Sequence, residues 1–396
     1  MIWAGLLTSR VRPNAASRFA FPGVAEWHVK RRPSLTVAGP RRIRTGFPVR
    51  PMVGAQTHHG ITMCYNLRCP GCPIASSSIQ AFASFIAACV AAGAIESATA
   101  SARAVEVVEN CAVSTAYERP PARAVTLNQA ATEVMLALHL EDRLVGTAYL
   151  DDRILPELAA AYGRVPVLAS KYPSTEVLLA ARPDFLYAAY PGAFGPTGVG
   201  SRADWKARGV DTYLAPAGCA DRNRPPGVTL ETTFNELRDV ARIFGVTARA
   251  AKLIDTYRAE LRSVQDRVGA DAKPPAVFWY DSGDPPEAGA CCGAPNEILR
   301  HLGARNIFAD TPGSWAPVSW EAVIARNPDV IVLANASWST AEVKRTLLLS
   351  RRALAGIEAL KQKRIVEIDF SYTTPGIRNV AAVRKLAEAL YPDRFR

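Results

Sequence analysis

Polar and aromatic side chains that follow predicted strands are the residues of this sequence best suited to bind a ligand. In two-lobed α/β proteins, ligands bind where the strands reach their carboxyl ends. In the first half of the chain these side chains are Asn128, Gln129, Tyr149, Asp151, Lys171, Tyr172 and Tyr190, and in the second half they are Tyr280, Asp281, Trp315, Trp338, Tyr372 and Arg378. Aromatic rings suit a planar ligand by stacking, while Lys171 and Arg378 suit a carboxylate or phosphate. Core packing is an equally good interpretation of any one aromatic residue.

Two adjacent cysteines offer a different chemistry. Cys291 and Cys292 precede a predicted helix over 296–302, and a thiol near a helix N-terminus can act as a ligand or a nucleophile. A vicinal disulfide or a pair of inert small residues fits the pattern equally well. An enzyme would use Cys291 or Asp281 in the cleft, but no activating His stands beside that cysteine in the sequence.

Signatures of catalysis and metal binding are missing from the sequence. It holds no Gly-rich phosphate loop, no Gly-x-Ser-x-Gly elbow and no acid pair on a common helix face. Beyond residue 104 the only histidines are His139 and His301, both on predicted helix faces. We therefore expect no catalytic residue, no resident metal and no cofactor, and any metal would arrive inside a chelate.

The first 104 residues differ from the rest of the chain. Positions 1–60 carry ten basic residues and one acidic residue, which is +9 of the net charge of +11 over 396 residues. The remainder is nearly neutral, which argues against a nucleic-acid partner. An Arg- and Pro-rich stretch without apolar periodicity is typical of a disordered arm, a transit peptide or sequence upstream of the true start, and Met63 is an alternative start.

An uncharged stretch between Arg68 and Glu96 is typical of the apolar region of an export signal. Within it, Ile86-Ala87-Ala88-Cys89 resembles the lipobox of bacterial lipoproteins, in which Cys89 would be acylated. Cleavage near 98–102 and a buried Ala-rich helix are the alternatives. We expect an extracytoplasmic protein, either periplasmic or anchored to the membrane as a lipoprotein.

Cysteine usage agrees with export. In an oxidising compartment Cys111 and Cys219 could form one disulfide. The pair Cys69-x-x-Cys72 lacks a second pair at zinc spacing, and we interpret it as part of the leader rather than a metal site.

Short β-branched or aromatic runs alternate with helical periods from about residue 103 onward, which predicts parallel α/β layers. The predicted strands are 124–127, 144–147, 185–188, 211–214, 276–280, 330–333 and 365–368, and helices are predicted at 132–140, 174–181 and 320–326. A purely helical segment separates the two sets of strands. Its first helix ends at Gly245, and the second runs from 248 to Val268, is capped by Thr247 and is closed by Gly269. Its 21 residues span roughly 32 Å, enough to cross between two lobes.

An internal repeat supports two similar lobes. The segments 174–186 and 319–331 lie 145 residues apart and share Ser, Glu, Ala, Pro and Asp in register. Each segment predicts a Ser N-cap, a short helix, a Pro-Asp turn and a buried strand. A weaker pair, Glu133 and Glu297, opens a helix in each half. Chance similarity of generic helix–turn–strand units is the alternative to duplication.

These features resemble the solute-binding proteins of iron–siderophore, haem and cobalamin ABC importers, which are hinged on a single helix. The resemblance covers about residues 105–396 and implies two Rossmann-like α/β lobes, at 105–228 and 273–396, joined by a helical connector at 229–272 after a leader at 1–104. It implies a monomer that binds a small molecule between the lobes. It also implies docking to an ABC permease through one Glu per lobe, here Glu176 and Glu321.

The stretches 127–133, 146–152 and 376–383 resemble more narrowly the branch proposed to carry a precursor of a deazaflavin coenzyme. Siderophore, haem and cobalamin are equally compatible with an aromatic cleft that bears few charges. An enzyme acting in the cleft and a surface receptor without a permease are the competing functions.

Overall fold

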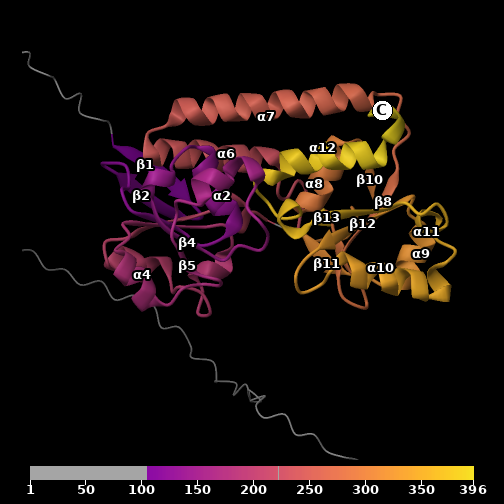
Figure 1. Cartoon of the computed structure of the whole chain (residues 1–396), viewed down its shortest axis with the longest axis horizontal. Helices are drawn as coiled ribbons and strands as arrows, with labels where there is room; N and C mark the ends of the chain where they lie inside the picture. The colour runs from indigo at the N-terminus through magenta and orange to yellow at the C-terminus, as the bar shows by residue number, and fades with distance from the viewer. Residues whose placement is uncertain (1–104, 222) are drawn as a thin grey trace, which may run out of the picture. The chain divides into compact units, whose positions relative to one another are not determined.

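The computed structural model describes residues 105–396 except residue 222, and contains two α/β lobes within one compact unit (Figure 1). The first lobe is built on a five-stranded parallel sheet in the order β5-β4-β3-β6-β7. Its strands are β3 (Ala124–Thr126), β4 (Leu144–Ala148), β5 (Val167–Ala169), β6 (Phe185–Ala188) and β7 (Asp211–Leu214). A separate antiparallel hairpin, β1 (Glu106–Asn110) with β2 (Val113–Tyr117), precedes it.

The second lobe is built on a mixed sheet in the order β11-β9-β8-β12-β13, and β10 pairs with β8. The strands β8, β10, β12 and β13 run parallel, whereas β9 and β11 are antiparallel to their neighbours. Their bounds are β8 (Ala276–Ser282), β9 (Glu287–Gly289), β10 (Arg305–Asn306), β11 (Trp315–Pro317), β12 (Val330–Asn335) and β13 (Ile365–Asp369). The two sheets confirm the α/β class expected from the alternating pattern.

Helices connect the strands in both lobes. In the first lobe they are α2 (Gln129–Ala137), α3 (Ala159–Tyr162), α4 (Thr175–Ala181) and α5 (Arg202–Ala207). In the second lobe they are α8 (Ala294–His301), α9 (Trp320–Arg326), α10 (Ala341–Ser350), α11 (Glu358–Lys361) and α12 (Arg378–Leu390).

Two connector helices link the lobes. The helix α6 (Leu230–Phe244) begins at a Thr229 capping box and ends at Gly245, whose φ of 71° lies in the left-handed region that glycine adopts without strain. The helix α7 (Thr247–Val268) is 22 residues long and lies along α6 and α12 (Figure 1). The expected bounds of this helix are correct to one residue, although Thr247 is its first residue and not a side-chain cap.

The internal repeat is a structural repeat. Ser174 accepts a hydrogen bond from the Val177 N–H at the start of α4, and Ser319 accepts one from the Ala322 N–H at the start of α9. The Asp of each Pro-Asp turn also has an equivalent partner. Asp184 accepts from the backbone N–H groups of residues 122 and 123 just before β3, and Asp329 accepts from that of Ala276 in β8. The repeated carboxylate therefore fastens the end of a short helix to the neighbouring strand in each lobe.

The main core runs through both lobes. One hydrophobic cluster contains Tyr187 of the first lobe, Phe234 of α6, Leu261 of α7, Trp279 of the second lobe and Val383 of α12. Two smaller clusters fill the remaining faces of the two sheets. Because the main cluster is continuous through the connector helices, moving one lobe against the other has to shear packed side chains.

Candidate functional site

A small cavity lies between the two lobes. Gln129, Ala130, Glu133, Asp151 and Tyr190 of the first lobe and Ser371, Thr374, Gly376, Ile377 and Arg378 of the second lobe line it. Gln129 and Tyr190 follow β3 and β6, and Asp151 follows β4, so the cavity lies at the carboxyl ends of the first sheet. Four of the residues expected to contact a ligand, Gln129, Asp151, Tyr190 and Arg378, are thus brought together.

A buried ion pair forms one wall of the cavity. The Arg378 guanidinium donates from Nε to both carboxylate oxygens of Glu133, at 3.0 and 2.8 Å, and its Nη2 donates to Glu133 and to the Arg153 carbonyl. Burial lowers the pKa of Arg378, but the Glu133 carboxylate more than compensates and the pKa lies above its ordinary value. The expectation that Arg378 is free to bind an anionic ligand does not fit this pairing. Glu133, 245 residues away in the chain, already neutralises it.

Asn128 and Gln129 serve mainly to shape the backbone at the cavity edge. The buried Asn128 accepts hydrogen bonds from the N–H groups of Ala189 and Tyr190 and so ties the start of α2 to the end of β6. The Gln129 side chain accepts from the N–H groups of Asp151 and Asp152 at 3.0 and 2.8 Å. Both amides therefore fix the loops that carry the cavity-lining residues Asp151 and Tyr190.

Asp151 stands beside a cluster of aromatic rings. Tyr149 and Tyr172 meet edge to face with centroids 4.8 Å apart, and the Lys171 ammonium lies 4.2 Å from the centroid of Tyr149. Burial raises the pKa of the Asp151 carboxyl to about 6, with Lys171 acting in the opposite direction and Asp152 adding to the rise. This carboxyl therefore changes charge within the physiological pH range.

The second lobe faces this group with a short 3₁₀ turn, η6 (Phe370–Tyr372). The Ser371 N–H donates to the Asp152 carboxylate at 2.7 Å, which is a direct contact between the lobes. The Ser371 hydroxyl is itself buried, and no partner binds it among the described residues. It lines the cavity with Thr374. Sequence reasoning missed Glu133, Ser371 and Thr374 as cavity residues, because nothing local distinguishes them.

The other candidates of the second lobe lie outside the cavity lining. Tyr280 is 1% exposed, packs against Phe278 and Trp320 in the core, and donates to the Gly283 carbonyl. The rule that residues following strands face a ligand does not hold for Tyr280, because β8 continues to Ser282 and buries this ring. The Asp281 carboxylate accepts a hydrogen bond from the Ser282 hydroxyl, and the Asp281 backbone carbonyl accepts one from the ammonium of the buried Lys344.

Two of the remaining aromatic candidates contact residues beside the cavity, and Trp315 does not line it. Trp338 is 55% exposed and packs on Phe370 of η6 at 4.6 Å, so it borders the turn that carries Ser371. Tyr372 stacks under the Arg378 guanidinium at 5.1 Å, and Trp315 is a half-buried residue of the edge strand β11.

Glu176 and Glu321 occupy equivalent exposed positions in the first turns of α4 and α9. A hydrogen bond with the Ser174 side chain lowers the pKa of the Glu176 carboxyl. Hydrogen bonds with the Glu321 backbone N–H and then with the Ser319 side chain lower the pKa of the Glu321 carboxyl. Each therefore presents a stable negative charge. Exposed apolar side chains accompany them, namely Val177 and Leu179 on α4 and Ile324 on α9.

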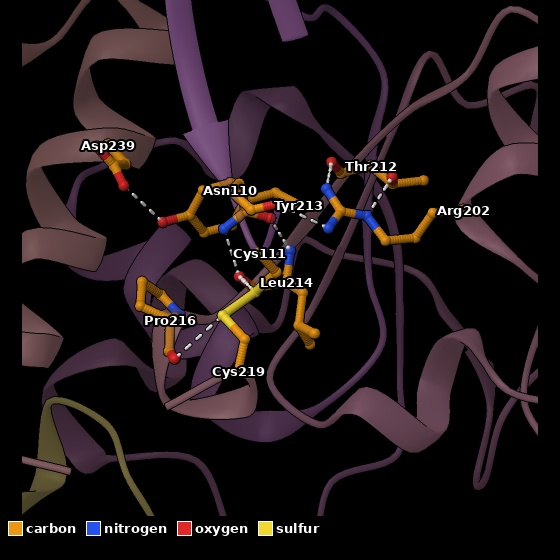
Figure 2. Close-up of a disulfide and its surroundings, with 9 residues drawn as sticks. All are labelled: Asn110, Cys111, Arg202, Thr212, Tyr213, Leu214, Pro216, Cys219 and Asp239. Carbon is orange, nitrogen blue, oxygen red and sulfur yellow. Dashed lines mark hydrogen bonds between the residues drawn. A yellow bond between two sulfur atoms is a disulfide. The ribbon is translucent and has the colours of Figure 1, made fainter. Parts of the chain in front are cut away.

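Two disulfides are present among the described residues. Cys111 in the β1–β2 turn forms a disulfide with Cys219, which follows β7. Beside it, the Asn110 side-chain amide donates a hydrogen bond to the Leu214 carbonyl and accepts one from the Leu214 N–H (Figure 2). Cys291 and Cys292 form a vicinal disulfide at the start of α8. A disulfide leaves no thiolate for the nucleophilic role considered for Cys291. Cys89 and the rest of the leader lie outside the described residues.

The described residues give no sign of a metal centre or a membrane span. Within 105–396, residue 222 aside, no three His, Cys, Asp or Glu side chains gather closely enough to hold an ion. None of the helices over the same residues combines the length and the apolar character that crossing a bilayer requires.

Comparison with known proteins agrees with the fold. A relative from Bacillus subtilis, described as the uncharacterized ABC transporter substrate-binding lipoprotein YvrC, is 25% identical over 283 residues, which is 70% of this chain and 83% of the relative. The vitamin B12-binding protein of Vibrio parahaemolyticus is 25% identical over 57% of this chain and 75% of its own.

A solved structure of a periplasmic binding protein from Veillonella parvula is 30% identical, has a TM-score of 0.66, and is matched over 73% of this chain and 98% of that one. The family model described as periplasmic binding protein matches residues 125–372. All of these descriptions are of binding proteins, which agrees with the expectation that the chain is not an enzyme. The chain therefore belongs to the periplasmic binding protein family.

Proposed function

We propose that this protein is the extracytoplasmic solute-binding component of an ABC importer and takes up a ring-rich metal chelate or corrinoid. The observation that carries the proposal is the cavity between the lobes, where side chains from the ends of β3, β4 and β6 meet η6 and α12. The substrate-binding lipoprotein and the vitamin B12-binding protein among its relatives support the same role.

The ligand would lie against the rings around the cavity. Tyr149, Tyr172 and Tyr190 stand on the first-lobe side, and Trp338 and Tyr372 on the second. Aromatic faces of this kind stack on planar ligands. Cobalamin, haem and an iron–siderophore are the candidates, and a deazaflavin precursor belongs in the same panel because of its ring system.

Calorimetric titration of the purified chain tests this proposal. The probes are cyanocobalamin, haemin, a ferric trihydroxamate chelate and a deazaflavin. We expect one of them to bind with 1:1 stoichiometry, without chemical conversion, and to bind more weakly when Tyr172 is replaced by Ala. Failure of all four to bind would contradict the proposed ligand class.

Docking to the permease would use Glu176 and Glu321. Their equivalent places in a duplicated helix give one exposed carboxylate per lobe, and the apolar side chains beside them would be covered on contact. Arg residues of the permease are the natural partners for such carboxylates.

An uptake assay separates docking from binding. We expect the double variant Glu176→Ala/Glu321→Ala to abolish uptake by cells and to leave the affinity for the probe within twofold. Glu342→Ala is the matched control, because Glu342 is an exposed acid in the first turn of α10 behind the cap Thr340. Equal loss of uptake in the control, or loss of affinity in the double variant, would argue against docking through these two residues.

A further inference from the structure

We propose that the cavity between the lobes is a subsite for a cationic, hydrogen-bond-donating group of the ligand, such as a primary ammonium, and not for a carboxylate or phosphate. The inference rests on the proposed function, since it assumes that the ligand enters this cavity. It concerns which part of the ligand the cavity selects.

The charges of the lining carry the first step. Glu133 and Arg378 neutralise one another through several hydrogen bonds, so neither is available to a ligand without breaking a buried ion pair. The charged residue that remains in the lining is Asp151. Only its backbone N–H is engaged, by Gln129, and among the described residues no hydrogen bond to its carboxylate is found. The free charge of the cavity is therefore negative.

The second step is a buried hydroxyl on the opposite wall. Ser371 is 7% exposed, lines the cavity and has no hydrogen-bond partner for Oγ among the described residues. An unsatisfied buried hydroxyl costs free energy, which a ligand group can recover by bonding to it. Asp151 and Ser371 come from different lobes, so a donor placed between them would also join the lobes.

The third step is a cation already present at the rim. The Lys171 ammonium lies over the Tyr149 ring at 4.2 Å, and its charge acts on Asp151. Lys171 itself is exposed on the loop before α4. The Lys171 ammonium thus lies over the Tyr149 ring and interacts with the Asp151 carboxylate. The same ring and carboxylate would stabilise a positive group of the ligand. A ligand ammonium would compete with Lys171 for this place.

The test uses two matched pairs of probes that differ in charge. One pair is a ferric trihydroxamate chelate with a terminal ammonium and its N-acetylated form, and the other is aquacobalamin and cyanocobalamin. In titrations of the full chain, the cationic member of the pair that binds should have at least tenfold higher affinity than the neutral member. Asp151→Asn should remove that preference and leave the neutral member within twofold. Asp266→Asn, which removes one exposed carboxylate on α7, is the matched control and should change neither.

Lys171→Met and Ser371→Ala provide independent checks if Asp151→Asn perturbs folding. Lys171→Met should strengthen binding of the cationic probe about threefold or more, and Ser371→Ala should weaken it. Equal affinity for both members of a pair, or loss of binding in Lys171→Met, would overturn the cationic subsite while leaving the proposed function intact. Failure of both pairs to bind would overturn this inference, and the proposed function would fall with it only if haemin and the deazaflavin also fail to bind.

Discussion

Glu236 is a carboxyl group that the fold holds in the protein interior. It lies on α6, is 2% exposed, and binds the hydroxyl of Tyr187 from β6, while Asp239 one turn later accepts from Tyr213 of β7. Burial raises the pKa of Glu236 to about 7, against a lowering by the Tyr187 hydrogen bond, and Asp239 adds to the rise. Up to about pH 7 the native state therefore still binds a proton at Glu236 in part of its molecules, whereas the unfolded chain has lost it.

The direction of the resulting pH dependence follows from proton counting. Between the ordinary pKa of 4.5 and about 7, the native state binds more protons at Glu236 than the unfolded state does, so stability falls as pH rises. The fall attributable to this group is about 3 kcal/mol over the whole window. Urea unfolding at a series of pH values from 4.5 to 8 should show this decline in the free energy of unfolding. Glu236→Gln should flatten the decline and raise the free energy of unfolding at pH 8, whereas Glu342→Gln, at an exposed position, should leave the decline unchanged. A profile unchanged by Glu236→Gln would contradict a protonated Glu236.

At the scale of elements, most of the strands predicted from composition are largely buried, β13 being the exception. The strands β6, β7 and β12 are almost wholly buried, and their predicted positions are correct. Among the strands not predicted, β5, β9 and β11 have three residues each and lie at sheet edges or next to them. Runs this short carry no detectable period. The helix α2 begins at Gln129 and not at residue 132, because Asn128, whose side chain is bonded to β6, takes the N-cap position.

The two disulfides act on elements very differently. The Cys111–Cys219 bond closes a loop with a sequence separation of 108 and fastens the β1–β2 hairpin to the end of the first sheet. Cross-links stabilise mainly by restricting the unfolded chain, and the loss of chain entropy for a loop of this length is worth about 5 kcal/mol. Cys111→Ser/Cys219→Ser should lower the free energy of unfolding by about 3–5 kcal/mol in denaturant titrations. The vicinal pair closes no chain segment, so Cys291→Ser/Cys292→Ser should cost far less. Equal losses in the two double variants would contradict this entropic account.

At the scale of the molecule, the cavity was only partly predictable. The carboxyl-end rule grouped Gln129, Asp151 and Tyr190, which do line one cavity, because parallel strands deliver their following loops to one edge of a sheet. It did not reveal that Glu133 and Arg378 neutralise each other, since these residues lie 245 positions apart in the sequence and meet only where the two lobes pack together. Local patterns specify which face of a helix is buried, but not which distant charge faces it.

The continuous core predicts that the lobes move little when a ligand binds. Leu261 of α7 and Val383 of α12 belong to the same cluster as residues of both sheets, and α7 contacts both α6 and α12. A large closure would expose this apolar surface, which costs roughly 25 cal/mol for each Å².

Spin labels carried by unnatural amino acids at the exposed positions Val167 and Leu349, one in each lobe, would report the distance between the lobes. We expect the distance distribution to stay centred at the same value when the bound probe saturates the protein. In Leu261→Ala/Val383→Ala, where this packing is weakened, the distribution should broaden and respond to the probe. A shift of several ångströms in the unaltered protein would show that the lobes hinge freely despite the shared core.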